Sequence, residues 1–234
     1  EAYHAADYRV YAYLQLARDA EARKTLQEVL QVTGTNPARN TAPYALAAMP
    51  ARLAVERGAW DEAARLQPRP SRFPFTDAMT HFARAIGAAR SGDAGSAQKD
   101  SEQLARLRDT LKAANDGYWA TEVEVSRLAA VAWTALAQGR TDEALARMRE
   151  AADTEDRNEK HIVTPGRLLP ARELLGDMLL ELKRPAEALK EFELSQQREP
   201  NRFRGIFGTA RAAASAGDTA KARQAYTRLD RKST

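Results

Sequence analysis

The 234-residue chain carries a net charge of +4, has 44% hydrophobic residues and contains no cysteine. Disulfides and thiol catalysis are therefore excluded, and no apolar run approaches the roughly 18 residues that a membrane helix needs. It has neither a long Lys/Arg cluster nor a basic–aromatic alternation, so we expect no nucleic-acid partner. Arg exceeds Lys, which is typical of a GC-rich bacterial genome. Because the chain starts at Glu1 rather than Met, we expect a trimmed chain whose compartment, cytoplasmic or exported, stays open.

Apolar residues recur at helical spacing from Ala2 onward, and no strand-like alternation of convincing length is present. We therefore predict an all-helical protein. A small residue behind a short turn marks the second helix of each of six predicted hairpins: Ala22, Ala63, Ala97, Ala144, Ala188 and Ala222. Their intervals are 41, 34, 47, 44 and 34 residues, and a recurring period of this size is typical of a helical solenoid.

The first helix of each hairpin is expected to cross the second at a residue twelve positions earlier. These residues are Val10, Ala51, Ala85, Ala132, Gly176 and Ala210. The intervals longer than 34 residues predict two departures from regular stacking. One is a long second helix over Ala94–Ala114, followed by a long first helix over Gly117–Gln138. The other is a polar loop over Asp153–Pro170, whose prolines interrupt any helix.

The best-formed repeat runs from Glu173 to Pro200, with Gly176 in its first helix and Ala188 and Phe192 in its second. It resembles a tetratricopeptide repeat nearly position for position. The segment Phe203–Leu229 resembles a second copy, in which Tyr226 takes the place of Phe192, and Leu128–Ala151 resembles a third. The resemblance implies a right-handed α-solenoid of about six hairpins in a single domain over residues 1–234. Its parts are degenerate repeats in 1–115, a long central hairpin in 117–152, an inserted loop in 153–170 and regular repeats in 171–234.

Three segments are similar to uncharacterised bacterial tetratricopeptide proteins: Tyr8–Ala22, Glu159–Gly166 and Arg198–Gly205. Those relatives are longer, so we expect this chain to correspond to their C-terminal part. The family resemblance implies a scaffold that holds a protein or peptide partner, and it implies no reaction. We therefore expect no enzymatic activity and no cofactor, while a homo-oligomer stays open.

The first helices of a tetratricopeptide array line its concave groove, and this nominates residues for partner binding. They are Tyr11, Arg52, Phe82, Ile86, Trp133, Glu173, Asp177, Phe207 and Arg211. Tyr, Trp and Arg are the residues that most often dominate binding energy, although Phe82 and Trp133 have an equally weighted alternative as core residues. Chaperone-binding members of the family hold a C-terminal carboxylate with Lys and Asn. The corresponding positions here carry no such pair, so we expect no clamp of that kind.

Glu173, Asp177 and Glu181 form a row of carboxylates at i, i+4 and i+8 on one predicted helix. Adjacent like charges destabilise a helix by a few tenths of a kcal/mol per pair, so a compensating charge is expected. One interpretation is recognition of a basic peptide or amine. The other, which we favour, is a ladder of ion pairs with Arg204 and Arg211.

The inserted loop is highly charged, and we expect it to fold back over the groove with Glu159 and His161 as a gate. The alternative is that it points outward as a tolerated insertion. The three histidines (His4, His81 and His161) lack the paired spacing of zinc enzymes, so no metal site is predicted. The alternative function is the helical portion of a longer enzyme, or a metal- or small-ligand-binding protein, whose site is completed by upstream residues.

Overall fold

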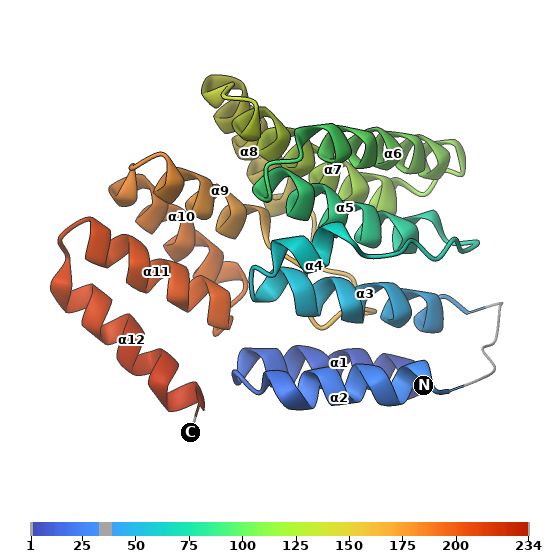
Figure 1. Cartoon of the computed structure of the whole chain (residues 1–234), viewed down its shortest axis with the longest axis horizontal. Helices are drawn as coiled ribbons and strands as arrows, with labels where there is room; N and C mark the ends of the chain where they lie inside the picture. Colours follow the sequence, from blue (N-terminus) through green and yellow to red (C-terminus); the bar gives the residue numbers. More distant parts are fainter. Residues whose placement is uncertain (1, 33–38, 234) are drawn as a thin grey trace.

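The computed structural model describes residues 2–32 and 39–233, and every regular element in these ranges is an α-helix (Figure 1). The predicted all-helical class is therefore confirmed for the described residues. None of their helices is long and apolar enough to cross a bilayer. In chain order the helices are α1 (Ala2–Gln15), α2 (Asp19–Leu30), α3 (Thr41–Glu56), α4 (Trp60–Ala64), α5 (Pro74–Arg90), α6 (Ala94–Ala113), α7 (Gly117–Ala137), α8 (Thr141–Asp156), α9 (Ala171–Glu181), α10 (Pro185–Arg198), α11 (Phe203–Ser215) and α12 (Thr219–Ser233).

Consecutive helices form hairpins whose turns share one geometry. Two residues beyond the first helix of each hairpin lies a residue with a left-handed backbone: Ala17, Gly58, Gly92, Gly139, Lys183 and Gly217. The following residue donates its N–H to a carbonyl five positions earlier, as from Ala59 to Ala54 and from Asp218 to Ala213, both at 2.9 Å. This bond defines a Schellman turn, which favours Gly at the left-handed position. The turns recur at the same intervals as the alanines singled out in the sequence.

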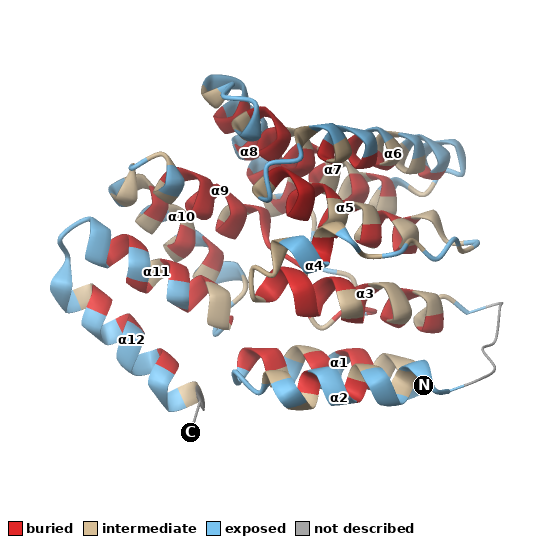
Figure 2. Cartoon of the chain, viewed as in Figure 1, coloured by how far each residue is buried: buried red, intermediate tan, exposed pale blue. Residues whose placement is uncertain are grey.

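The helices of the described residues form an inner and an outer layer. The odd-numbered helices contact one another in chain order from α1 to α11, and α11 in turn contacts α1. Each even-numbered helix packs on the odd-numbered helix that precedes it, and α2, α4, α6, α8 and α10 pack also on the one that follows. Figure 2 shows the consequence: α5 and α9 are largely buried, whereas α2, α6 and α12 expose one side. The six first helices therefore surround a common interior.

Small side chains allow this close packing. All six predicted second-helix alanines and all six predicted crossing residues are buried. The tightest approach is at Gly87 of α5, where a Cβ atom would lie 2.6 Å from the backbone nitrogen of Ala64 and 2.6 Å from the carbonyl oxygen of Trp60. Because a backbone cannot yield as a flexible side chain can, Gly87 fixes the short helix α4 directly against α5.

The predicted bounds of the two long central helices agree with α6 and α7 to within one residue. The predicted loop differs at its start, because α8 continues to Asp156 instead of ending at residue 152. Residues 153–156 are polar, but Glu155 is buried, and its Oε1 accepts the N–H of Ala171 at 2.9 Å. That bond ties the last turn of α8 to the start of α9, so the connecting segment, which we call the inner loop, spans residues 157–170.

Candidate functional site

The first half of the inner loop lies on the N-terminal end of α7. The hydroxyl of Tyr118 donates to the carbonyl oxygen of Glu159 at 2.8 Å. The ring of His161 packs against Trp119, with 5.1 Å between ring centroids, and its Nδ1 accepts the N–H of Val163 at 3.1 Å. The side chain of Glu159 is exposed and that of His161 is half-buried. The two predicted gate residues are thus brought together beside α7.

The second half of the inner loop lies on α1 and α3. Nη1 of the buried Arg52 donates to the carbonyl oxygen of Gly166 at 3.0 Å. Gly166 approaches α1 so closely that a Cβ atom would lie 2.9 Å from the ring of Tyr11. Arg52 also faces Asp7 of α1, with 3.4 Å between Nε and Oδ1. The chain's own loop therefore covers the inner face of its first two hairpins.

Arg167 anchors the inner loop among three carboxylates. Its guanidinium faces Glu122 at 3.0 Å, Glu155 at 3.4 Å and Glu199 at 3.7 Å, and it donates to the carbonyl oxygen of Asn158 at 2.7 Å. One guanidinium thus faces three carboxyl groups. Burial raises the pKa of Glu155 to about 8, because the attraction of Arg167 only partly opposes this shift.

The protonation of Glu155 predicts a pH-dependent stability difference. Between its ordinary pKa of 4.5 and about 8, the unfolded chain has released this proton while the folded chain keeps it. The contribution of Glu155 to the unfolding free energy therefore falls with rising pH, by at most about 1.4 kcal/mol per unit. We expect Glu155→Gln, which cannot ionise, to gain stability relative to wild type as pH rises across this window. Urea unfolding at about pH 5.5, 6.5 and 7.5 measures this difference, and the exposed Glu159→Gln is the control. If the difference in unfolding free energy between Glu155→Gln and wild type stays constant with pH, titration of Glu155 in this window is ruled out.

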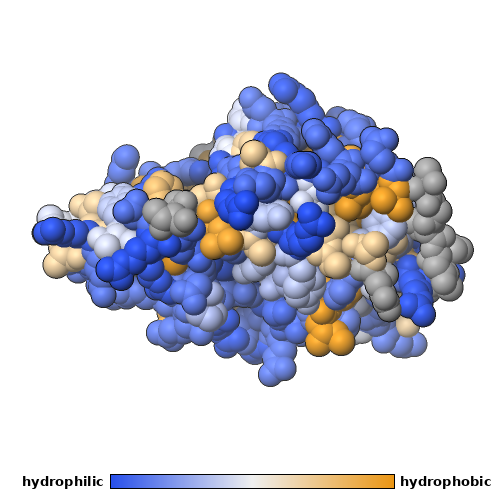
Figure 3. Space-filling view, turned by 90° about the horizontal axis from the view of Figure 1, so that it is seen from below, coloured by the Kyte–Doolittle hydropathy of each residue, from blue (hydrophilic) through white to orange (hydrophobic). Residues whose placement is uncertain are grey.

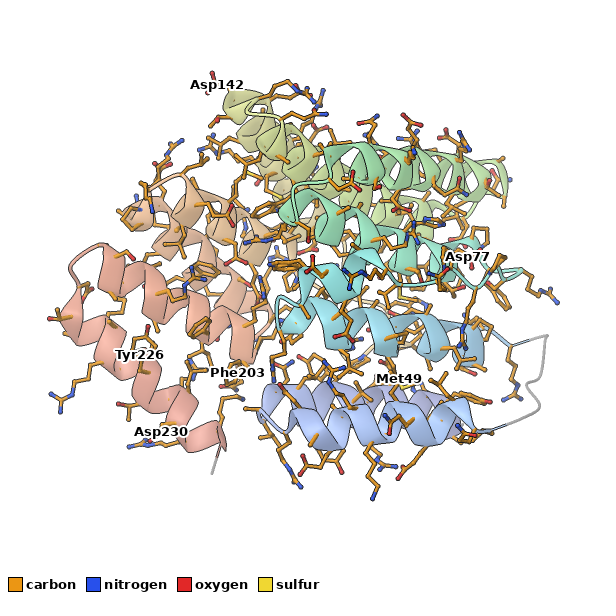
Figure 4. The ribbon with its side chains drawn as sticks, viewed as in Figure 1. Met49, Asp77, Asp142, Phe203, Tyr226 and Asp230 are labelled. Carbon is orange, nitrogen blue, oxygen red and sulfur yellow. The ribbon has the colours of Figure 1, made fainter. Side chains whose placement is uncertain are left out.

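A second buried cluster joins the two ends of the array. Arg202 donates from Nη2 to Glu56 of α3 at 2.8 Å and from Nε to Glu173 of α9 at 3.0 Å, and all three side chains are fully buried. Gln15 of α1 donates to Glu56 at 3.1 Å and accepts the N–H of Phe203 at 2.7 Å. Phe203 lies at the end of α11 that faces α1 and α3 (Figure 4). We call this set the Arg202 cluster, and it closes α11 onto α1 and α3.

The pKa values of the two carboxyls of the Arg202 cluster are shifted in opposite directions, although burial acts to raise both. Desolvation raises the pKa of Glu173 despite the attraction of Arg202. At Glu56 desolvation is outweighed by Arg202 and by the hydrogen bond from Gln15, so the pKa lies below its ordinary value. Arg202, Glu56 and Glu173 thus form a buried ion triad, in which removing one partner would leave the others without a compensating charge.

The predicted acidic row is paired within the chain. Glu173 pairs with Arg202, Asp177 with Arg204 and Arg211, and Glu181 with Arg90. The favoured ladder with Arg204 and Arg211 is thus confirmed at Asp177, whereas the other two carboxylates have different partners. A basic peptide would have to displace these arginines, so the row does not support recognition of a basic ligand.

Arginines and aromatic rings alternate where α4, α5, α7 and α11 meet. The guanidinium of Arg90 lies 4.5 Å from the ring centroid of Trp60 and 4.1 Å from that of Trp133. The guanidinium of Arg204 lies 5.5 Å from the ring of Trp60. We call these four residues the arginine–aromatic cluster. Arginine–ring contacts of this kind are attractive and become stronger when shielded from water.

The arginine–aromatic cluster continues to the surface along α11. Arg211 contacts Asp177 at 3.8 Å and lies 5.6 Å from the ring of Phe207. Phe207 and Arg211 are exposed. Trp133, Phe207 and Arg211 could be predicted from the sequence, because they lie at inward positions counted from the middle of a first helix. Trp60 and Arg90 could not, since Trp60 begins a second helix and Arg90 ends a first helix.

The predicted groove residues divide into two groups. Six of them are buried in the described structure: Arg52, Phe82, Ile86, Trp133, Glu173 and Asp177. For Phe82 and Trp133 this agrees with the alternative of core residues, and a role of the six in partner binding stays a prediction. Tyr11 is half-buried beneath the inner loop, while Phe207 and Arg211 are exposed. The physical reason is that closely packed first helices and the inner loop fill the interior. Phe82, for example, lines a cavity of only about 70 Å³ beneath Leu168.

The three histidines lie in separate environments. His4 contacts Tyr8 edge-on at 4.9 Å, and His81 bonds Asp100 at 2.7 Å. His161 packs in the inner loop. Within residues 2–32 and 39–233, no group of three His, Cys, Asp or Glu side chains is arranged to hold a metal ion.

Comparison of the chain with protein-family models and with curated proteins found no match.

Proposed function

We propose that this chain is a helical-repeat scaffold of the tetratricopeptide type, which binds a protein or peptide partner and catalyses no reaction. Three features support the repeat assignment: the order of the hairpins, their common turns and the environment of Phe192. The ring of Phe192 is fully buried, and Cβ atoms at Gly176 of α9 and at Gly208 of α11 would overlap it. A ring wedged between glycines of successive first helices agrees with the spacing that the resemblance implies.

The proposed partner surface is the outer end of the arginine–aromatic cluster together with Phe207 and Arg211. The observation that carries the proposal is that the largely buried arginine–aromatic cluster continues to the exposed side chains of Phe207 and Arg211. Such residues are enriched among those that dominate binding at interfaces. The interior is filled by the inner loop, so it offers less surface to a partner. The face of the molecule in Figure 3 is mainly hydrophilic, with apolar residues in small separate groups, and so shows no broad apolar surface for self-association.

The double substitution Phe207→Ala, Arg211→Ala tests this proposal. Both side chains are exposed, so the melting temperature should stay nearly unchanged. We expect partner capture from the native lysate to be lost, with affinity lowered on the order of 10- to 100-fold. Tyr226→Ala is the matched control, because Tyr226 is an equally exposed ring on α12 (44% against 41% for Phe207). Equal capture by all three proteins would contradict the proposed surface.

A further inference from the structure

Helix α12, which packs on α11 at one end of the molecule, carries most of the chain's surplus charge (Figure 1). The helix and the Asp218 that precedes it hold five Lys/Arg against two Asp, which accounts for three of the net charge of +4. The apolar side chains of Ala225 and Leu229 are buried against α11. The surplus charge therefore lies at the surface.

Two of these cations have no carboxylate partner among the described residues. Arg228 donates to the side-chain oxygen of Asn201, which is a neutral amide. Desolvation and the like charge of Arg228, one turn earlier, both lower the pKa of Lys232. Other outer helices pair such cations within one turn, as Arg147 pairs with Glu150 in α8. The helix dipole favours cations near a C-terminus but carries only about half a charge, so it does not neutralise them.

A surface hollow lies beside Arg228, between α10 and α12. Its volume is about 250 Å³, whereas a water molecule takes up about 30 Å³ of liquid. The buried Ile206 and Ala225 give it an apolar floor, and the exposed Gln224 and Arg228 stand at its rim. Gln224 and Arg228 also belong to the outer face of α12 that includes Lys232. The hollow is thus open at this rim and has room for a side chain of another molecule.

The other charges around the hollow balance one another. Lys221 pairs with Glu193 of α10 and is also stabilised by the charge of Asp218. Asp230 follows Arg228 by two residues, so it lies about 200° around the helix and away from the hollow. The two cations without a carboxylate partner therefore favour an anion, which they hold through charge-assisted hydrogen bonds.

Three observations favour an acidic segment of another protein over other anions. A helix on a membrane surface buries an apolar face in lipid, but that face of α12 lies against α11. Single-stranded nucleic acid stacks on aromatic rings, but the exposed ring of Tyr226 lies about 200° around α12 from Arg228. In a second copy, carboxylates of the most acidic helix, α8, already pair with arginines: Glu143, Glu150, Asp153 and Asp156.

We propose that an acidic segment of a partner protein binds at this hollow, with one carboxylate on Arg228 and another on Lys232. The methylene groups of the first acidic side chain lie on Ile206 in the floor of the hollow. That the acid belongs to a protein rests on the proposed function. The surface is nevertheless a different one from that of Phe207 and Arg211.

Fluorescence anisotropy with two rhodamine-labelled peptides tests this proposal. The probes are N-acetyl-Ala-Glu-Glu-Ala-Glu-Glu-Ala-amide and its counterpart with Gln in place of every Glu. We expect the Glu peptide to bind saturably and the Gln peptide not to bind. Because the cations are at the surface, binding should weaken when NaCl is raised from about 50 to 500 mM.

Three variants locate the binding. Arg228→Gln, Lys232→Gln removes both cations, and we expect it to weaken the Glu peptide about 10-fold. The matched control is Arg106→Gln, Lys112→Gln on α6, which removes equal charge from exposed side chains. Arg106, like Arg228, donates to a neutral amide. Gln224→Glu keeps both cations but places a carboxylate one turn before Arg228, so it should weaken binding while favouring the helix.

The proposal is overturned if the Gln peptide binds as tightly as the Glu peptide, or if both double variants weaken binding equally. It is also overturned if vesicles with about 20% phosphatidylserine or a single-stranded DNA of about 20 nucleotides bind more tightly and lose binding in Arg228→Gln, Lys232→Gln. Self-association of the wild type that this variant abolishes would assign the surface to a second copy instead. Partner capture by Phe207 and Arg211 is measured separately, so either surface can fail while the other stands.

Discussion

We expect Arg202→Met to lower the free energy of unfolding by about 3–5 kcal/mol, because it leaves Glu56 and Glu173 buried without their cation. Both carboxyls are fully buried, so water cannot replace the guanidinium. Urea unfolding at about pH 7 measures the loss. The deficit should shrink toward pH 5, because carboxyls without Arg202 take up protons more readily.

Two comparisons separate the buried charge from the mere loss of an arginine. Arg198→Met removes an exposed ion pair with Asp156 and should cost less than about 1 kcal/mol. Adding Glu56→Gln and Glu173→Gln to Arg202→Met should recover part of the stability, because no buried charge then remains unpaired. If Arg198→Met and Arg202→Met lower the free energy of unfolding by the same small amount, the account of the Arg202 cluster is contradicted.

We expect Phe192→Ala to lower the free energy of unfolding by about 3–5 kcal/mol through the cavity it leaves between α9 and α11. For a chain of this length the melting temperature should fall by on the order of 10 °C. The ring fills the gap that Gly176 and Gly208 leave open, where a Cβ atom at Gly176 would lie 2.7 Å from it. Thermal unfolding followed by circular dichroism measures the effect.

Tyr226→Ala is the natural control for Phe192→Ala. Tyr226 occupies the matching position 34 residues later, but it is exposed at 44% because no further helix pair of the described chain covers it. Its loss should therefore change stability by no more than about 0.5 kcal/mol. Similar losses for both variants would show that repeat position, and not packing between the glycines, determines the cost.

The helical hairpins could be predicted from the sequence because their signals are local. Gly217 ends a helix, Ala222 follows five residues later, and the same order recurs upstream, so a single repeat carries the information. The loop was predicted to begin at Asp153, four residues too early, because residues 153–156 are polar and polar runs are typical of loops. In the structure α8 continues to Asp156, and its last turn is held by the hydrogen bond from the Ala171 N–H to Glu155, which no local pattern predicts.

The closure of the array could not be predicted, because it depends on pairs far apart in the chain. Glu56 and Arg202 are 146 positions apart, and neither helix pattern marks the other as its partner. A signal was nevertheless present. The segments Glu159–Gly166 and Arg198–Gly205, noted for their resemblance to bacterial relatives, contribute the inner loop and the arginines Arg202 and Arg204.

The same closure explains why most of the predicted groove residues are buried. Inward positions were assigned on the assumption of an open array. The contact of α11 with α1 and the inner loop on α3 bury those positions, as Arg52 and Glu173 illustrate. Phe207 on α11 lies outside this closed region and is exposed. The partner surface that we propose is therefore at the rim of the first helices rather than along their whole length.

The most direct test of the central claim is site-specific photo-crosslinking with p-benzoylphenylalanine placed at Phe207 or, as the control, at Tyr226. Both positions carry exposed rings, so the probe should leave the fold unchanged. A scaffold that binds its partner at the arginine–aromatic cluster predicts a crosslinked partner from position 207, none from position 226, and loss of the product when Arg211 is replaced by Ala. Equal crosslinking from both positions, or none from 207 while a partner is captured, would contradict the claim.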